Sequence, residues 1–208
     1  DISWIDSEDI REDNVAAQLA GCDGIIVPGG FGDRGIEGMI TTAKYCREHD
    51  IPYLGICLGM QIAVIEFARH VCGLADANSG EFSKTSAHKI IDFLPDQSET
   101  IDKGATLRLG AYPCHILPGT RMHECYGCDE IRERHRHRYE FNNDYREMLT
   151  GAGMTLCGQS PDGHIVEAVE LSDHRFFVGV QFHPEFKSRP NRAHPLFKAL
   201  VESSLKNK

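Results

Sequence analysis

The sequence has no apolar run long enough to cross a membrane, and no secretory leader is visible at its start. Positive charge is also scarce: 22 lysine and arginine residues stand against 31 aspartate and glutamate residues, and the net charge is −9. Nucleic-acid binding requires a basic face, so this balance disfavours it. We also find no internal repeat and no low-complexity linker. The sequence therefore predicts a globular protein that binds neither membranes nor nucleic acids.

A disulfide framework is not indicated either. The eight cysteines are scattered through apolar segments of a sizeable chain, which favours reduced thiols and a cytoplasmic location. Cys125 and Cys128 form a C-x-x-C pair with His123, His135 and His137 nearby in the sequence, so a zinc site is one alternative. There is no second C-x-x-C, and the histidine spacing is not that of a zinc finger. We expect no metal, although the sequence leaves this pair open.

The chain does contain a regular succession of buried strands and helices. Its 208 residues suffice for one domain with a full core. Apolar strands and helical patterns alternate at 24–28, 36–49, 51–56 and 58–70. This order predicts an α/β fold with a mostly parallel sheet and helices on both faces. The chain begins at Asp1 rather than at methionine, so we expect residues 1–208 to be one domain of a longer chain.

The second half of the chain predicts shorter elements. We expect strands at 89–94, 107–116, 155–159, 165–170 and 176–182, and a final helix at 195–205. Pro113 should break the second of these strands, and 95–104 should be an acidic loop. Near the start, we expect a short strand at 2–5 and a short helix at 15–19.

Cys57 stands where the strand at 51–56 turns directly into a helix. Gly55 and Gly59 flank it, which is the cysteine counterpart of the Gly-x-Ser-x-Gly nucleophile elbow. Such a bend would place the sulfur at a helix N-terminus, whose positive dipole end favours the thiolate. The backbone N–H of Leu58 would then face an oxyanion on the attacked group. The alternative is a structural cysteine, because free cysteine is usually a small core residue.

His183 and Glu185 can supply the base that a thiol nucleophile needs. In an extended segment, residues two apart point the same way, so the Glu185 carboxylate can approach the His183 imidazole. Pro184 favours that extended backbone at His183. A His-Pro-Glu at a strand end is otherwise a structural corner, but a cysteine elbow in the same chain favours a catalytic pair.

Two further runs bear on the same site. Gly29 and Gly30 follow the first long strand, and glycine lets backbone N–H groups approach a ligand, so this loop is a second oxyanion candidate. It lacks the lysine and the spacing of a phosphate-binding P-loop. The alternation at 131–141 places Arg132, Arg134, Arg136 and Arg138 on one face and Ile131, Glu133, His135, His137, Tyr139 and Phe141 on the other. The arginines form either a phosphate patch or a solvated face, and one in the crevice would bind a substrate carboxylate.

These motifs resemble those of the class I, or triad, glutamine amidotransferases. The general likeness rests on Gly-Ile-Cys-Leu-Gly-Met-Gln at 55–61 and Gln-Phe-His-Pro-Glu-Phe at 181–186. Pro-Gly-Gly-Phe-Gly-Asp-Arg-Gly at 28–35 and Arg-His-Arg-His-Arg-Tyr-Glu-Phe-Asn-Asn at 134–143 are more specific and resemble the C-terminal glutaminase domain of CTP synthases. The resemblance covers nearly the whole chain. It implies a flavodoxin-like α/β sheet with a small antiparallel β portion.

The resemblance also implies roles for individual residues. Cys57 would attack the side-chain amide of L-glutamine, with His183 as base and acid and Glu185 orienting it, and the glutamyl thioester would be hydrolysed to glutamate and ammonia. Gly30 and Leu58 would form the oxyanion hole. The residues implied to hold glutamine are Gly30, Leu58, Gly59, Met60, Gln61, Glu81 and Arg138. By charge, Arg138 suits the α-carboxylate and Glu81 the α-ammonium group.

In the family, ammonia passes to an N-terminal synthetase domain of the same chain, which aminates UTP to CTP with ATP and Mg²⁺. GTP activates the glutaminase allosterically, and the full-length enzyme would be a homotetramer. The resemblance implies no cofactor in the domain at 1–208, which lacks the synthetase domain. It also lacks the family's strand and helix before residues 2–5, which leaves the GTP response and the activity of the isolated domain open.

Three rival hypotheses remain at this point. Another elbow-type cysteine hydrolase, such as a γ-glutamyl hydrolase, is not expected to carry the arginine–histidine run at 134–138. A non-catalytic regulatory module with the same fold would be supported by loss of Cys57 or His183, and both are present. The third is a zinc-binding interaction domain built on Cys125 and Cys128.

Overall fold

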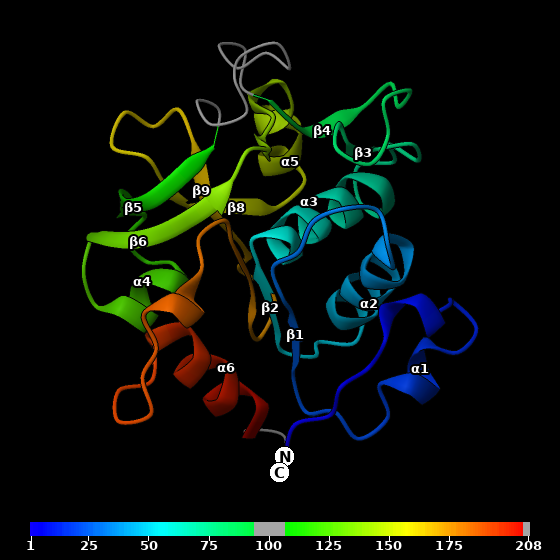
Figure 1. Cartoon of the computed structure of the whole chain (residues 1–208), viewed down its shortest axis with the longest axis horizontal. Coiled ribbons are helices and arrows are strands. Elements are labelled where there is room, and N and C mark those ends of the chain that lie inside the picture. Colours follow the sequence, from blue (N-terminus) through cyan, green and yellow to red (C-terminus); the bar gives the residue numbers. More distant parts are fainter. Residues whose placement is uncertain (94–106, 206–208) are drawn as a thin grey trace.

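The computed structural model describes residues 1–93 and 107–205. Within them, seven strands form a central sheet in the order β1-β2-β10-β9-β8-β5-β6 (Figure 1). These strands are β1 (Ile25–Val27), β2 (Tyr53–Ile56), β5 (Arg108–Ile116), β6 (Glu130–His137), β8 (Met154–Gln159), β9 (Val166–Leu171) and β10 (Phe177–Val180). None of the helices in this described part of the chain is long and apolar enough to span a membrane.

The α/β fold class is confirmed, but the sheet is mixed rather than mostly parallel. β2 pairs in parallel with β1 and with β10, whereas β10–β9, β9–β8, β8–β5 and β5–β6 are antiparallel. Short connections join β8 to β9 and β9 to β10, and a short connection can link only antiparallel neighbours, because a parallel pair needs a long crossover. The antiparallel portion is therefore larger than the sequence suggested.

Helices cover both faces of the central sheet (Figure 1). The helices are α1 (Val15–Gln18), α2 (Ile36–Glu48), α3 (Leu58–His70), α4 (Arg121–Tyr126), α5 (Arg146–Gly151) and α6 (Pro195–Leu205), with 3₁₀ turns η1 (Ser7–Asp9), η2 (Asn143–Tyr145) and η3 (Pro184–Phe186). Successive residues of β2 face opposite sides. Tyr53 stacks on Phe177 with 4.5 Å between ring centroids in the core beneath α3, whereas Leu54 belongs to the second core with Leu196 and Leu200 of α6.

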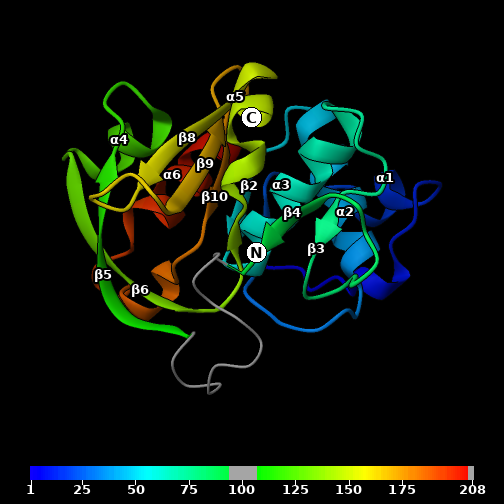
Figure 2. The ribbon, with the colours of Figure 1, turned by 90° about the horizontal axis from the view of Figure 1, so that it is seen from above.

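A small second sheet lies beside α3 (Figure 2). It consists of β3 (Asn78–Ser79), β4 (Lys89–Asp92) and β7 (Glu140–Phe141). β4 pairs in parallel with β3 and antiparallel with β7. Because β7 directly follows β6 in the chain, this sheet connects the last strand of the central sheet with the side of the molecule that carries α3.

Two local predictions are wrong. Residues 2–5 do not form a strand. β5 runs unbroken through Pro113, which lies opposite Arg132 of β6. Among the described residues, β8 pairs with β5 at His115 and Ile116, so β5 has one neighbour at Pro113, where a strand tolerates proline. The loop predicted at 95–104 lies outside the described residues.

The alternation predicted for β6 is confirmed, and its inner face is polar. Arg132, Arg134 and Arg136 are exposed, whereas His135 and His137 are buried. The two imidazoles lie 2.9 Å apart, Nδ1 of His135 to Nε2 of His137. Burial lowers the pKa of His135 to about 3, with smaller contributions from the nearby charges of other residues. The buried face of β6 therefore carries a pair of neutral imidazoles, those of His135 and His137.

The junction between β2 and α3 depends on a close approach between backbones. A Cβ at Gly55 would lie 2.5 Å from the carbonyl carbon of Gly59, and one at Gly59 would lie 2.1 Å from the carbonyl oxygen of Val27 in β1. Neither neighbour is a flexible side chain that could rotate away. The hydroxyl of Tyr53 donates a hydrogen bond to the carbonyl of Gly59 at 2.8 Å, which holds the first turn of α3 against β2.

We expect Gly59→Ala to lower the free energy of unfolding by about 3 kcal/mol, because its methyl group would overlap the Val27 carbonyl. Urea denaturation followed by circular dichroism measures this loss. Gly151→Ala is the matched control, since a Cβ there meets nothing within 4 Å at the end of α5. Equal stability of the two variants would contradict the close approach.

Candidate active site

Three neighbouring strands end at the same edge of the sheet. Cys57 follows β2, the loop with Gly29 and Gly30 follows β1, and His183 comes soon after β10. Because β1, β2 and β10 are parallel neighbours, their carboxyl ends lie side by side, where α/β sheets bind ligands. The backbone N–H of Cys57 donates to the carbonyl of Val180 at 2.7 Å, which ties the end of β2 to the end of β10.

Cys57 has the strained backbone of an elbow. Its φ of 50° and ψ of −100° are rare for any residue other than glycine, and it is the N-cap of α3. The side chain is buried, with 5% of its surface exposed. The sharp turn expected from the flanking glycines is therefore present, although the residue stays within the packing rather than standing out of it.

The environment of the Cys57 sulfur favours the thiol rather than the thiolate. Burial raises its pKa to about 12, and the negative charges of Glu185, Glu81 and Glu140 add to this effect. The backbone N–H of Leu58 donates to the sulfur and acts in the opposite direction. The helix N-terminus thus favours the thiolate through the Leu58 N–H, as expected, but desolvation outweighs it. A base would therefore have to take this proton for the sulfur to act as a nucleophile.

The imidazole of His183 is held in the orientation of such a base. Its Nδ1 lies 2.6 Å from Oε1 of Glu185, and a carboxylate can only accept, so Nδ1–H donates. In the neutral ring, Nε2 then carries the free lone pair. That atom is buried and has no hydrogen-bond partner among the described residues. The backbone N–H of His183 donates to the carbonyl of Arg134 in β6 at 2.8 Å, and the ring of Phe186 stacks on the imidazole.

Gly29 brings Cys57 and His183 together. A Cβ built on Gly29 would lie 2.8 Å from Cε1 of the imidazole and 3.6 Å from Cβ of Cys57. The two side chains thus flank one point, and only a residue without a side chain leaves room for both. The structure therefore brings Cys57, the His183 imidazole and the Glu185 carboxylate close together.

The two residues expected to stabilise an oxyanion are also adjacent. A Cβ on Gly30 would lie 3.0 Å from Cδ2 of Leu58, so the glycine loop packs against the first residue of α3. Gly59 and Met60 follow Leu58 in the first turn of that helix and are buried. The backbone beside the sulfur is therefore lined by the glycine loop and by the helix N-terminus.

Glu81 and Arg138 reach the same region from the second sheet and from the end of β6. Oε1 of Glu81 accepts a hydrogen bond from the backbone N–H of Gly32 at 3.2 Å. Burial raises the pKa of Glu81, while the Gly32 N–H and the positive charge of Arg138 act to lower it. Arg138 is half-buried, unlike the exposed arginines before it on β6. A carboxylate and a guanidinium thus lie near the glycine loop.

Gln61 lies inside the site, and it contacts a residue that the sequence analysis did not single out. Its Nε2 donates to the backbone carbonyl of Tyr139 and to Oε1 of Gln181, both at 3.2 Å. Nε2 of Gln181 in turn lies 3.6 Å from the sulfur of Cys57. The signal was available, since Gln181 directly follows β10 and stands two residues before His183.

Two other candidates lie outside this arrangement. Cys125 is half-buried and Cys128 is exposed, and both are free thiols. Among the residues that the structure describes, no group of three or more histidine, cysteine, aspartate or glutamate side chains is arranged to hold a metal ion. The C-x-x-C pair therefore has no further ligands around it in the described structure.

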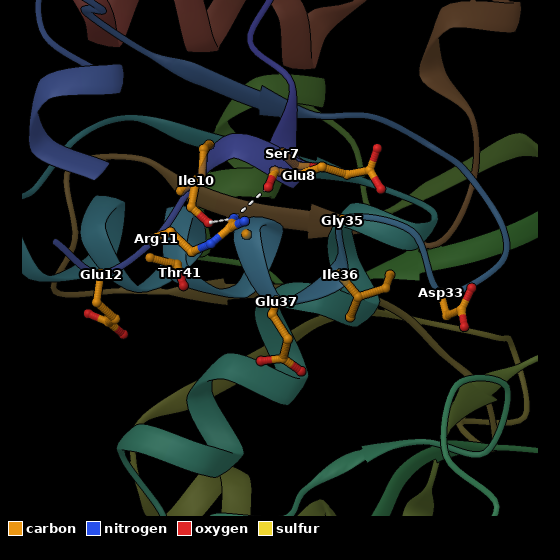
Figure 3. Close-up of a pocket in the computed structure, with 11 residues that line it drawn as sticks. Ser7, Glu8, Ile10, Arg11, Glu12, Asp33, Gly35, Ile36, Glu37 and Thr41 are labelled. Atoms are coloured by element: carbon orange, nitrogen blue, oxygen red, sulfur yellow. Dashed lines mark hydrogen bonds between the residues drawn. The ribbon is translucent and has the colours of Figure 1, made fainter. Parts of the chain in front are cut away.

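A hollow of about 510 Å³ opens at the start of α2 (Figure 3). There the guanidinium of Arg11 donates to the carbonyl of Ile10 at 2.9 Å, and Glu12 and Glu37 also line the hollow. Its lining includes none of the predicted site residues. It is thus separate from the cysteine elbow.

Comparison with known proteins gives consistent matches. The family model described as Glutamine amidotransferase class-I matches residues 1–203. The CTP synthases of Carboxydothermus hydrogenoformans and Moorella thermoacetica are 60% and 61% identical to this chain over 99% and 97% of its length. The matched regions are 38% and 37% of those two proteins, so this chain spans well under half of the curated relatives' length.

A solved structure matches over nearly the whole fold. The glutaminase domain of Trypanosoma brucei CTPS with bound acivicin superposes with a TM-score of 0.93 at 41% sequence identity. The match covers 99% of this chain and 81% of that one. The chain therefore belongs to the class I glutamine amidotransferase family, as a glutaminase domain of the CTP synthase type.

Proposed function

We propose that Cys57, His183 and Glu185 form the triad that hydrolyses L-glutamine, the reaction of this family, to glutamate and ammonia. The observation that carries this proposal is the hydrogen bonding of the His183 imidazole. Glu185 occupies Nδ1 at 2.6 Å, and the buried Nε2 is left without a partner in the described structure. The imidazole and the Cys57 side chain both lie against Gly29. This is the arrangement that nucleophile, base and orienting acid require.

The first half of the reaction transfers the glutamyl group to sulfur. Nε2 of His183 takes the thiol proton as Sγ of Cys57 attacks the side-chain amide carbon of glutamine. The negative charge on the amide oxygen is stabilised by the backbone N–H groups of Leu58 and Gly30. The C–N bond then breaks, and His183 returns the proton to the departing nitrogen, which leaves as ammonia.

The second half regenerates the enzyme. His183 removes a proton from a water molecule, whose oxygen attacks the thioester carbon. The C–S bond breaks, the sulfur takes the proton back from His183, and glutamate leaves. Glu185 favours the imidazolium in both halves, because its carboxylate accepts from Nδ1–H throughout. The high thiol pKa of the resting state implies that proton transfer accompanies attack rather than preceding it.

We assign the recognition of the amino-acid end of glutamine to Arg138 and Glu81. A guanidinium binds an α-carboxylate through two parallel hydrogen bonds, and a carboxylate suits an α-ammonium group. Glu81 already contacts the glycine loop through Gly32, so a bound ammonium group would lie between the second sheet and that loop. Gly59, Met60 and Gln61 would line the side-chain end beside the sulfur.

We further propose that residues 1–208 are one domain of a longer enzyme, in which the ammonia is used for amination of UTP to CTP. The support is that the matched relatives are named CTP synthase and are much longer than this chain. In that enzyme, ATP, Mg²⁺ and UTP would act at an N-terminal synthetase domain, and GTP would activate the glutaminase. A cytoplasmic homotetramer is part of the same proposal.

We expect 6-diazo-5-oxo-L-norleucine, a reactive glutamine mimic, to add one covalent group to the wild-type protein at Cys57. Intact mass and peptide mapping measure this, and Cys57→Ala should remain unlabelled and release no ammonia from glutamine. Cys114→Ala, which removes another buried thiol of the same core, serves as the control and should label normally. Labelling of the Cys57→Ala variant would refute the assignment.

We expect Arg138→Ala to raise the KM for glutamine about 10–100-fold with a much smaller change in kcat, because it removes a charge-assisted bond made in both ground and transition states. Steady-state ammonia release gives both constants. Arg136→Ala, two residues earlier on the same face of the strand, is the control and should behave like wild type. Equal KM values for the two variants would argue against Arg138 as the carboxylate ligand.

In the full-length enzyme, Cys57→Ala should abolish CTP formation with glutamine as nitrogen donor. The same variant should still form CTP when ammonium chloride replaces glutamine, because the synthetase site would be intact. CTP is followed by its absorbance in the presence of UTP, ATP and Mg²⁺. Loss of activity with both donors would show that this chain does not simply supply ammonia.

A further inference from the structure

The side chain of Gln181 lies directly against the nucleophile. Its Nε2 is 3.6 Å from Sγ of Cys57, within range for an N–H···S hydrogen bond, and the residue is fully buried with 0% of its surface exposed. Its backbone N–H is also held, by the carbonyl of Glu167 at 2.8 Å. A buried amide that is fixed at both ends beside a reacting atom is a candidate for a chemical role.

The hydrogen-bond network determines which end of this amide faces the sulfur. The oxygen and nitrogen of an amide have similar shapes, so the orientation must follow from the partners. The backbone carbonyl of Tyr139 can only accept, and Gln61 contacts it, so that atom of Gln61 must be the donor Nε2. The same Nε2 also contacts Gln181, which must therefore present its oxygen to Gln61 and its NH₂ group to Cys57.

A second donor restrains the same carbonyl. Nδ1 of His137 lies 3.3 Å from the Tyr139 oxygen, so Nδ1–H donates to it. Nε2 of His137 is then an acceptor for Nδ1–H of His135 at 2.9 Å. The carbonyl that orients Gln61 is thus itself held by the neutral imidazole pair inside the sheet. His137 and Gln61 thus both donate to this carbonyl, and a further series of donors runs from Gln61 through Gln181 to the sulfur.

The charges around the sulfur show why a donor matters there. Glu185 of η3, Glu81 after β3 and Glu140 of β7 all disfavour a negative sulfur, as does burial. The imidazole of His183, the proposed base, lies against Gly29 together with Cys57. Against the three carboxylates stand the Leu58 N–H and the amide of Gln181. When the backbone N–H of Leu58 donates to the substrate oxyanion, the Gln181 amide remains as a donor to the sulfur.

We propose that Gln181 is a catalytic residue whose side-chain amide donates a hydrogen bond to the Cys57 thiolate, and that Gln61 is a positioning residue that fixes this orientation. The bond stabilises the sulfur when His183 removes its proton. It stabilises the sulfur again as the leaving group when the thioester breaks. This proposal adds a residue to the proposed hydrolysis and rests on it. The hydrogen bond itself can be tested without glutamine.

The test is the rate of Cys57 alkylation by iodoacetamide between pH 7 and 10, resolved from the other thiols by peptide mapping. Gln181→Met keeps the length of the side chain and removes the donor. Without the donor, the pKa of the thiol rises, less thiolate is present at each pH, and alkylation at a fixed pH should slow about tenfold. Gln159→Met, whose amide donates instead to Leu156 on β8, is the control and should alkylate at the wild-type rate.

Gln61→Met supplies the second arm, because Gln61 orients the Gln181 amide from the side away from the sulfur. It should slow alkylation less than Gln181→Met, and it decides the matter if circular dichroism shows that Gln181→Met is unfolded. In steady-state kinetics, Gln181→Met should lower kcat by a similar factor while KM stays unchanged. Wild-type alkylation rates in both folded variants would overturn the proposal even if the protein is an active glutaminase. Slowed alkylation in a protein without glutaminase activity would instead refute only the proposed hydrolysis.

Discussion

The parallel pairing of β2 with β1 on one side and β10 on the other is the constraint on which the site depends. It brings three strand ends to one edge, and each delivers one part of the chemistry: the glycine loop, Cys57 and His183. The antiparallel strands beyond β10 do not contribute such ends, but β6 supports the site from the side through the bond between the Arg134 carbonyl and the His183 backbone. The mixed sheet thus combines a parallel part that collects reactive groups with an antiparallel part that holds them.

At this edge of the sheet, the positions occupied by glycine are as important as the positions that carry side chains. Gly29 leaves room for the imidazole beside the sulfur, and Gly55 and Gly59 let β2 turn into α3 against β1. These contacts involve backbone atoms or the His183 ring, which cannot move aside without disturbing the strands themselves. The strained backbone of Cys57 is held by its burial and by the hydrogen bond of its N–H to the Val180 carbonyl.

Much of this could be predicted from the sequence, because the informative patterns are local. Glycines two residues on each side of Cys57 indicate the elbow, and the spacing of His183 and Glu185 indicates their contact. The alternation of β6 predicts which of its side chains are buried. The strand directions in the sheet were harder to predict, since apolar runs such as those at β8 and β9 do not reveal whether a pair is parallel or antiparallel. Burial and nearby charge together raise the pKa of Cys57, and the charges come from residues that are distant in sequence, such as Glu140 and Glu81.

The high pKa of the Cys57 thiol has a consequence for the idle enzyme. Peroxides and other oxidants react with the thiolate, and an uncharged, buried thiol is a poor target for them. In the proposed reaction, Cys57 becomes anionic only when a substrate carbonyl is in place, which would shield it from sulfenic acid formation between turnovers. The desolvation that makes the sulfur harder to ionise also preserves it in its reduced, usable form.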